Sequence, residues 1–265
     1  MSGQTDLNKR LNFAREIADE AGRLTVDYFQ SSEVAVDWKP DDSPVTAADR
    51  ETEQLLRRRI ESAFPADGIV GEEFDDRSGT SGYQWILDPV DGTKSFISGV
   101  PLYGNLVAAT LGERAVLGVM NFPALRECIY ASVGQGSWYL RGNDEPQRAH
   151  VSNCTKLADA TFLTTDVRTF YNLGREGAYL NLQQAAKLSR TWGDCYGYLL
   201  VATGRADVMV DPLLNVWDAA ALQPILEEAG GTFTDWKGQP TIHSGEGIAT
   251  NRRILEEVLN AVSLA

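Results

Sequence analysis

The stretch 85–96, WILDPVDGTKSF, constrains the fold and chemistry of this chain more than any other. It continues an apolar run, rich in strand-forming residues, that begins at Tyr83 and becomes polar at Asp88 and Asp91. Gly92 follows directly, and the chain can then begin a helix. Carboxylates at the end of a buried strand can bind hard cations, and free N–H groups at a helix start can bind an anion. The stretch therefore predicts a site for metal-assisted phosphoryl chemistry.

Residues 88–92, DPVDG, also form a good turn sequence, because Pro fixes φ, Asp can bond its own backbone and Gly supplies a positive φ. This stretch alone leaves both interpretations open. Two further acidic stretches favour the metal site. Glu72 and Glu73 follow Gly71 upstream, and Asp218 lies far downstream.

Several motifs together resemble the inositol monophosphatase superfamily of metal-dependent, lithium-sensitive phosphatases. Residues 88–96 are similar to its first signature, and residues 217–220, WDAA, continuing to 228–231, EAGG, are similar to its second. Residues 71–73, GEE, match the glutamate motif, and residues 46–49, TAAD, match the threonine/aspartate motif. The resemblance extends from about residue 6 to the C-terminus, which makes it far more specific than one short motif.

This resemblance implies a set of metal ligands. Glu72, Asp88 and the carbonyl of Val90 would bind one ion, and Asp88, Asp91 and Asp218 would bind a second. The implied cofactor is Mg²⁺, two or three ions per active site. Magnesium takes oxygen ligands, which these groups supply. The chain has only two histidines, neither with a partner at ligand spacing, which argues against zinc.

The resemblance also implies the catalytic groups. Backbone N–H groups of Gly92 and Thr93 would hold the phosphate, and the Thr93 hydroxyl, backed by Asp49, would orient a metal-bound water that Glu72 also contacts. That water would attack phosphorus in line. The residues alone leave a second interpretation open for Asp49 and Asp218, since an acid in the first turn of a helix favours the helix dipole.

The substrate alcohol is expected to contact a different part of the chain. Asp211 precedes Asp218 by the family spacing of an acid that touches the alcohol, and Asp91 would share that contact. Gly193 and Asp194 occupy the segment that varies with substrate. Residues 194–196, DCY, resemble the corresponding segment of the histidinol-phosphate phosphatases of this superfamily, as do residues 231–238, GTFTDWKG. A surface acid or helix cap is the alternative for Asp194.

Three functions follow in order of preference. The first is hydrolysis of L-histidinol phosphate in histidine biosynthesis, because carboxylates at positions 194 and 211 would pair with its cationic groups. The second is an inositol-1-monophosphatase or a broad sugar-phosphate phosphatase. The third is a catalytically silent regulatory protein of the same fold. The partner in the first two cases is a small phosphorylated metabolite.

Charge and composition exclude other partners. The net charge of −13 argues against binding to nucleic acid or to an anionic membrane, since both require a basic surface. The three cysteines have no metal-like or disulfide-like spacing. The polar N-terminus and the lack of a long apolar run predict a cytoplasmic protein. A homodimer is implied by the resemblance.

Periodicity and turn residues predict an α/β (α+β) protein with strands and helices in both halves, 1–150 and 151–265. Helices are expected over 6–30, 46–63, 176–187, 195–203, 216–228 and 252–262. Strands are expected over 34–38, 68–70, 83–87, 104–111, 115–121, 127–133, 136–140, 161–165, 188–192, 206–210 and 248–250, with an antiparallel meander over 104–140. The resemblance implies a five-layered α-β-α-β-α sandwich.

Overall fold

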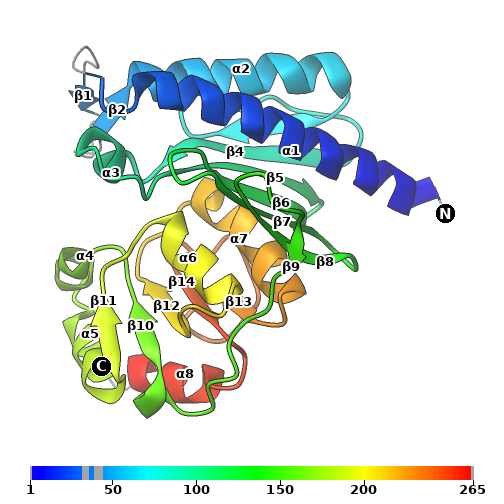
Figure 1. Cartoon of the computed structure of the whole chain (residues 1–265). Helices are drawn as coiled ribbons and strands as arrows, with labels where there is room; N and C mark the ends of the chain where they lie inside the picture. Colours follow the sequence, from blue (N-terminus) through cyan, green and yellow to red (C-terminus); the bar gives the residue numbers. More distant parts are fainter. Residues whose placement is uncertain (1, 32–35, 39–43, 264–265) are drawn as a thin grey trace.

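The computed structural model of the chain describes residues 2–31, 36–38 and 44–263. The elements form five layers, which Figure 1 shows from top to bottom. Two long helices cover a seven-stranded sheet, two central helices lie beneath it, and a five-stranded sheet and a last layer of helices follow. The α-β-α-β-α sandwich is therefore confirmed.

The upper helix layer consists of α1 (Ser2–Tyr28) and α2 (Ala47–Ala63). Thr46 caps α2, because its Oγ1 accepts a hydrogen bond from Ala48 N (3.1 Å) and the Asp49 side chain accepts one from Thr46 N (2.8 Å). The short strands β1 (Val36–Trp38) and β2 (Pro44–Thr46) pair beside this layer. Residues 34 and 35 of the predicted strand 34–38 lie outside the described residues.

The large sheet has the order β3-β4-β5-β6-β7-β8-β9, parallel between β3 and β4 and antiparallel elsewhere. The predicted meander is confirmed. The strand bounds are β3 Gly68–Gly71, β4 Tyr83–Asp91, β5 Gly104–Leu111, β6 Arg114–Phe122, β7 Glu127–Ser132, β8 Gly136–Arg141 and β9 Gln147–Arg148. The short helix α3 (Thr93–Ile97) follows β4 directly.

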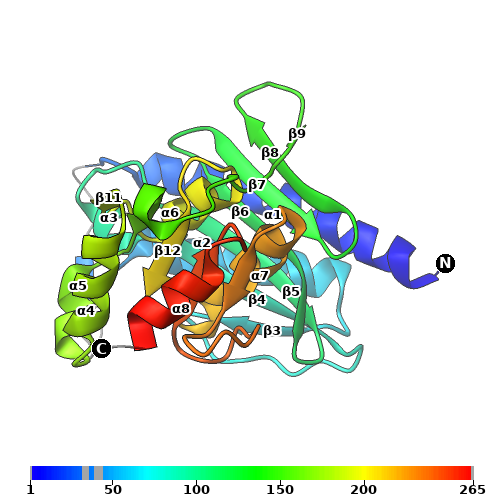
Figure 2. The ribbon, with the colours of Figure 1, turned by 90° about the horizontal axis from the view of Figure 1, so that it is seen from below.

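The small sheet has the order β11-β10-β12-β14-β13, with β10 parallel to both neighbours and β14 antiparallel to both of its own. Its strands are β10 Thr161–Leu163, β11 Leu188–Arg190, β12 Val208–Asp211, β13 Thr232–Thr234 and β14 Gly247–Thr250. The central helices are α6 (Cys195–Ala202) and α7 (Val216–Glu228). In the view from below, α8 (Leu255–Ser263) lies beside α4 (Val167–Asn172) and α5 (Glu176–Ala185) on the outer face (Figure 2).

One hydrophobic core joins the two sheets across α6 and α7. It contains Ile86 and Leu106 from the large sheet, Leu199 and Ile225 from the central helices and Phe233 from the small sheet. The predicted boundary near residue 150 stays a prediction, since the chain crosses between the sheets there but packs one core against both. In the part of the chain that the structure describes, no helix has the length and apolar character needed to cross a membrane.

A buried ion pair fastens α1 to the loop before β3. Arg10 donates to both carboxylate oxygens of Asp67, at 2.9 Å each, and Ser81 Oγ (2.6 Å) and Trp85 Nε1 (2.9 Å) donate to the same carboxylate. The guanidinium also lies 3.8 Å from the ring centroid of Tyr83. Burial would raise the pKa of Asp67, but these donors outweigh it and the pKa is lowered.

The sequence-based prediction missed β2, β9, η1 (Leu157–Asp159), α4 and β13. All five are short, and short segments carry too few residues for a periodicity to emerge. The first helix starts at Ser2 instead of residue 6, and β4 runs on to Asp91 although the apolar run stops at Leu87. The extension contains a β-bulge between Asp88 and Asp91.

Candidate active site

A β-bulge in β4 brings two carboxylates to the same face of the large sheet. Asp88 pairs with Leu106 of β5 and Asp91 pairs with Gly104, so three steps along β4 match two along β5. Without the extra residue, side chains three apart would point to opposite faces. The bulge tolerates Pro89, which has no N–H to contribute to the ladder. Both carboxylates therefore face the central helices.

Asp218 reaches the same place from the first turn of α7. One carboxylate oxygen from each of Asp88, Asp91 and Asp218 lies within 4.8 Å of the others, a group that could hold a metal ion. Asp218 also accepts a hydrogen bond from Asn215 N (2.6 Å) at the start of the helix. The metal-ligand and helix-start interpretations of Asp218 are thus compatible, since its carboxylate can accept a hydrogen bond at the start of α7 and still face Asp88 and Asp91.

The pKa values of these carboxylates are raised, first by burial and then by neighbouring negative charges. Burial, followed by the neighbouring charges of Glu72, Asp91 and Asp218, raises the pKa of Asp88 well above its usual range. The pKa of Asp91 is raised in the same way, and burial raises the pKa of Asp218 to about 7. A bound divalent cation reverses this repulsion. Carboxylate oxygens are the donors that Mg²⁺ prefers, so the residues fit the expected ion.

Glu72 lies at the edge of this group. Its charge contributes to the raised pKa values of Asp49, Asp88 and Asp218, which places it close to them. It is not one of the three carboxylates that lie within 4.8 Å of one another. Its role as a metal ligand therefore stays a prediction.

The segment that carries Glu72 is anchored to α2. The buried carboxylate of Glu53 accepts hydrogen bonds from Arg57 Nε (2.7 Å) and from the backbone N of Glu73 (2.7 Å). Arg57 also donates to the carbonyl of Phe74 (2.8 Å). Gly71 makes room for this contact, because a Cβ there would lie 2.1 Å from Glu53 Oε1.

Thr93 links the end of β4 to α2. Its hydroxyl lies 3.1 Å from the carbonyl oxygen of Val90 and 3.4 Å from Asp49 Oδ1. Asp49 is buried, and its other oxygen accepts hydrogen bonds from Thr46 N (2.8 Å) and Thr46 Oγ1 (2.6 Å). Asp49 lies in the first turn of α2, as the helix-dipole interpretation requires, and it also contacts Thr93.

Gly92 connects the bulge to α3 with a φ of 84°, a conformation that favours glycine. Space requires glycine too, because a Cβ at this position would lie 2.9 Å from Asp194 Oδ2. The start of α3 and the start of α6 therefore meet here. The roles of Gly92 and Thr93 in binding phosphate stay predictions.

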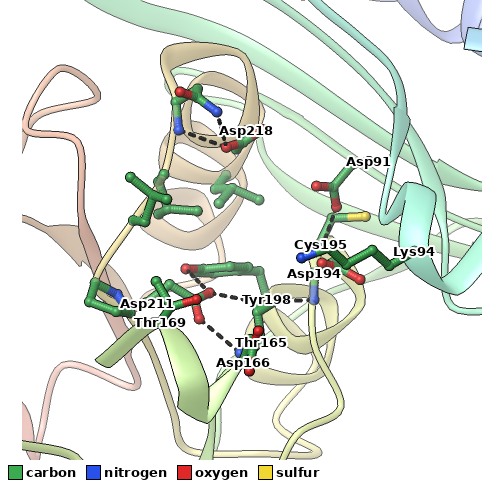
Figure 3. A pocket seen from close by; sticks show the side chains of 15 residues that line it. Asp91, Lys94, Thr165, Asp166, Thr169, Asp194, Cys195, Tyr198, Asp211 and Asp218 are labelled. Carbon is green, nitrogen blue, oxygen red and sulfur yellow. Dashed lines mark hydrogen bonds between the residues drawn. The ribbon is translucent and has the colours of Figure 1, made fainter. Parts of the chain in front are cut away.

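A pocket of about 230 Å³ opens beside these acids. Figure 3 shows Asp91, Lys94 and Asp194 on one side, with Asp211 and Tyr198 facing them across the opening. Asp166 lines the pocket as well. The pocket thus joins residues of both halves and carries several acids, which suits a small ligand with a cationic part.

Asp194 stands at the start of α6 with an uncommon backbone, φ 49° and ψ −152°. Its side chain makes no capping hydrogen bond to the helix and lines the pocket, which favours neither the surface-acid nor the helix-cap alternative. Its contact with a substrate stays a prediction. Among the described residues, Ser95 Oγ donates to it at 3.2 Å. Burial, followed by the charge of Asp211, raises its pKa to about 6. The next backbone N, that of Cys195, donates to Asp91 Oδ2 (2.5 Å).

Gly193 and Asp211 both lie against Thr165, next to the segment that carries Asp194. A Cβ on Gly193 would lie 2.5 Å from the Cα of Thr165, so glycine permits a close approach of two backbones. Asp211 lines the pocket but is only 2% exposed, and it accepts hydrogen bonds from Tyr198 Oη (2.9 Å) and from Thr165. Direct contacts of Gly193 and Asp211 with a substrate stay predictions.

Sequence reasoning missed Thr165 and Asp166 at the pocket. Both directly follow the short strand β10, within the polar triplet 164–166, TTD. Polar residues at the carboxyl end of a parallel strand are typical of ligand sites. That signal, the same one that singled out Asp88, could have found them.

Comparison with known proteins identifies the family. The model of the inositol monophosphatase family matches residues 6–264. The chain belongs to the inositol monophosphatase family. It is therefore a phosphatase of the inositol monophosphatase type with a phosphorylated metabolite as substrate, and the acids of β4 and α7 form a group that could bind the metal such enzymes need.

Similar sequences and structures agree with this family. The chain is 44% identical to a histidinol-phosphatase of Chlorobaculum parvum, covering 91% of each chain. It is 37% identical to a histidinol-phosphatase of Streptomyces coelicolor, over 94% of this chain and 95% of the relative. A solved inositol monophosphatase from Zymomonas mobilis is 34% identical and superposes with a TM-score of 0.84, covering 97% of this chain and 98% of the other.

Proposed function

We propose that this phosphatase hydrolyses L-histidinol phosphate to L-histidinol and phosphate, a step of histidine biosynthesis. The carboxylate of Asp194, which lines the pocket next to Gly92, carries this choice of alcohol. Histidinol phosphate has an ammonium group and an imidazole that becomes cationic near neutral pH. A carboxylate beside the phosphate site pairs with such a cation, whereas neutral inositol hydroxyls need it less. The two histidinol-phosphatases with 44% and 37% identity support the same choice.

The metal site belongs to the proposal. Glu72, Asp88, Asp91, Asp218 and the carbonyl of Val90 would hold two or three Mg²⁺ ions per active site. When bound, the ions would neutralise charge on the attacking and leaving oxygens of the ester. The protein's own contribution is to hold several buried acids close together, although burial and neighbouring charges raise their pKa values and so disfavour their ionised forms.

Thr93, Asp49 and Glu72 are proposed to orient the attacking water. A threonine hydroxyl has one hydrogen to donate and two lone pairs to accept. With its hydrogen directed to the Val90 carbonyl or to Asp49, Thr93 can accept a hydrogen bond from water. Glu72 would accept the other hydrogen of that water. In-line attack needs this fixed orientation more than it needs a protein nucleophile.

The phosphate is proposed to bind at the turn between β4 and α3. The N–H groups of Gly92 and Thr93 open the helix there and have no partner within its first turn. Asp91 and Asp194 lie next to this turn. A phosphate bound there would place the leaving alcohol toward Asp194, as the proposal requires.

The test compares phosphate release from histidinol phosphate and from inositol 1-phosphate, with and without Mg²⁺. We expect a preference of about a hundredfold for histidinol phosphate in kcat/KM, about 2.7 kcal/mol in transition-state binding. Asp194→Asn should reduce that preference by about tenfold or more. The matched control is Asp159→Asn, which changes an exposed acid of η1 away from the pocket.

Inositol 1-phosphate is the second candidate, because the solved inositol monophosphatase from Zymomonas mobilis is 34% identical over nearly the whole chain. A reversed preference in the same assay would assign this function instead, and similar slow rates would point to a broad sugar-phosphate phosphatase. No Mg²⁺-dependent hydrolysis of either ester would favour a catalytically silent protein. A homodimer and a cytoplasmic location stay predictions.

A further inference from the structure

The side chain of Asp211 is fully engaged by its own protein. Its Oδ1 accepts hydrogen bonds from Thr164 Oγ1 (3.0 Å) and from the backbone N of Thr165 (2.8 Å). Its Oδ2 accepts from Thr165 Oγ1 (3.0 Å) and Tyr198 Oη (2.9 Å). A carboxylate offers about four lone-pair sites. All four lone-pair sites of Asp211 are therefore used by donors from Thr164, Thr165 and Tyr198, and a substrate would have to displace one of these donors.

Thr165 passes the effect of Asp211 on to Asp194. Its hydroxyl has a single hydrogen, which is donated to Asp211 Oδ2. The oxygen of the same hydroxyl is therefore left as an acceptor, and the backbone N of Asp194 donates to it at 3.1 Å. The carboxylate of Asp211 thus determines which way the Thr165 hydroxyl points, and this direction lets it hold the Asp194 backbone.

Asp194 needs such support. A non-glycine residue with φ 49° and ψ −152° costs of the order of 1–3 kcal/mol and persists only where its surroundings hold it. The hydrogen bond from Asp194 N to Thr165 lies on one side of the residue. On the other side Cys195 N donates to Asp91 Oδ2. Gly193 lets the segment approach Thr165 closely enough for the first contact.

We propose that Asp211 is a positioning residue that holds the Asp194 carboxylate in the pocket through Thr165, and that it does not itself contact the substrate alcohol. This inference rests on the proposed function only in the role of Asp194 as the group that receives the substrate cation. The arrangement of Asp211, Thr165 and Asp194 does not depend on the identity of the substrate.

Asp211→Asn tests the arrangement because an amide replaces two acceptor sites with donors. The Thr165 hydroxyl then loses its charged acceptor and is free to turn away from the Asp194 N–H. Hydrogen exchange of the backbone amides, resolved by mass spectrometry to the peptide around residue 194, should become about tenfold faster or more in the full-length protein. Unchanged exchange at this peptide would overturn the proposal.

A pair of variants at Thr165 provides a second route should Asp211→Asn fail to fold. Thr165→Ser keeps the hydroxyl and should keep the slow exchange at residue 194. Thr165→Val has nearly the same shape without the hydroxyl, and it should exchange as fast as Asp211→Asn. Equal exchange in the serine and valine variants would contradict the proposed link.

Kinetics in the Mg²⁺-loaded enzyme separate positioning from direct contact. The quantity compared is the ratio of kcat/KM for histidinol phosphate to that for inositol 1-phosphate. If Asp211 acts through Asp194, Asp211→Asn lowers this ratio in the wild-type background but has no further effect in the Asp194→Asn background. If Asp211 binds the cation itself, the two reductions multiply, and the proposal is wrong.

Asp67→Asn is the matched control. Asp67 is also a buried carboxylate with four hydrogen bonds, but it lies in the N-terminal half, away from the pocket. Its loss should destabilise the protein without accelerating exchange at residue 194 or changing the substrate ratio. An enzyme with no preference for histidinol phosphate would refute the proposed function, while the exchange measurement would still decide the role of Asp211.

Discussion

Asp67 and Asp211 are carboxylates with nearly equal burial whose pKa values shift in opposite directions. Asp67 is 1% exposed and Asp211 is 2% exposed, and each accepts four hydrogen bonds. Two of the donors to Asp67 belong to the guanidinium of Arg10, and its pKa is lowered. The donors to Asp211 are hydroxyls and a backbone N–H, and burial raises its pKa.

The difference separates a structural use of buried charge from a functional one. The buried carboxylate of Asp67 is neutralised by a cation from the same chain, Arg10. Around the pocket, Asp88, Asp91, Asp194 and Asp218 have raised pKa values, first because they are buried and then because other carboxylates lie close to them. This leaves negative potential to be neutralised by metal ions and by a cationic substrate.

The largest effect is expected from Asp88→Asn, which removes a central ligand of the proposed metal site. Mg²⁺-dependent phosphatase activity should fall by about 1,000-fold or more, about 4 kcal/mol. The metal-free protein should become more stable, because one repelling carboxylate is lost. Thermal unfolding with and without Mg²⁺ measures this, and the stabilisation by Mg²⁺ should be much weaker than in the wild type. A variant that unfolds earlier without metal would contradict the contrast with Asp67.

The opposite change of stability is expected from Asp67→Asn. Arg10 would lose its buried partner, and breaking such a pair typically costs about 3–5 kcal/mol. Denaturant unfolding should show the loss, while kcat and KM of the folded fraction stay as in the wild type. The control is Asp76→Asn, an exposed acid of the same half, which should change stability by less than about 0.5 kcal/mol. A similar loss of unfolding free energy in both variants would mean that the ion pair between Arg10 and Asp67 does not stabilise the protein.

The effect of pH on the metal-free enzyme is smaller and follows from the raised pKa values. The unfolded chain releases the proton of Asp218 near the ordinary pKa of about 3.9, whereas the folded chain keeps it until about pH 7. Stability from this group is present at low pH and is lost as the pH rises between these values. The melting temperature in EDTA should therefore fall from about pH 5 to about pH 7.

Two comparisons check the assignment of this pH effect. Asp218→Asn should flatten the slope, and so should excess Mg²⁺, since both remove the penalty of ionising the cluster. The ion pair of Asp67 works in the reverse direction, because its pKa is lowered and its contribution is lost on acidification. A melting temperature that rises over the same range in EDTA would show that the acids of the pocket do not repel as described.

The smallest effect is expected from Asp166→Asn at the edge of the pocket. One oxygen of Asp166 accepts a hydrogen bond from Arg168 N (2.8 Å) as the cap of α4, and the charge acts on Asp194 from a distance. We expect kcat/KM for histidinol phosphate to fall two- to fivefold, about 0.5–1 kcal/mol, and the difference to shrink in high salt. Asp159→Asn serves as control again. A loss as large as that of Asp194→Asn would move the cation site to Asp166.

The sequence predicted which acids come together better than it predicted how their surroundings are arranged. Asp88, Asp91 and Asp218 belong to motifs that carry a family signature, and their meeting in space is what those motifs imply. The environment of Asp211 could not be predicted, because Asp211 ends β12 while its donors come from the segment after β10 and from α6. Thr165 has no motif of its own, and its role depends on a hydroxyl that points to one neighbour while accepting from another.

Periodicity likewise predicted the individual elements but not their layers. The apolar alternation of the strands from 104 to 140 indicates a meander, since consecutive antiparallel strands need only short turns. The order β11-β10-β12-β14-β13 joins strands far apart in the sequence. Which of those strands become neighbours depends on how the central helices cover them, and no local pattern contains that information.

The bulge at residues 88–91 also determines which side chains of β4 face each neighbouring layer. Trp85 and Leu87 face the upper helices, while Ile86 and Asp88 face the central ones, as alternation requires. The odd residue inserted before Asp91 shifts the phase of the strand by one step, and Asn105 Nδ2 holds the shift by donating to the Pro89 carbonyl (2.6 Å). A deletion of one residue here would turn Asp91 into the apolar layer beneath α1 and α2. The fold of this strand thus tolerates the substitution of one residue better than the insertion or deletion of one.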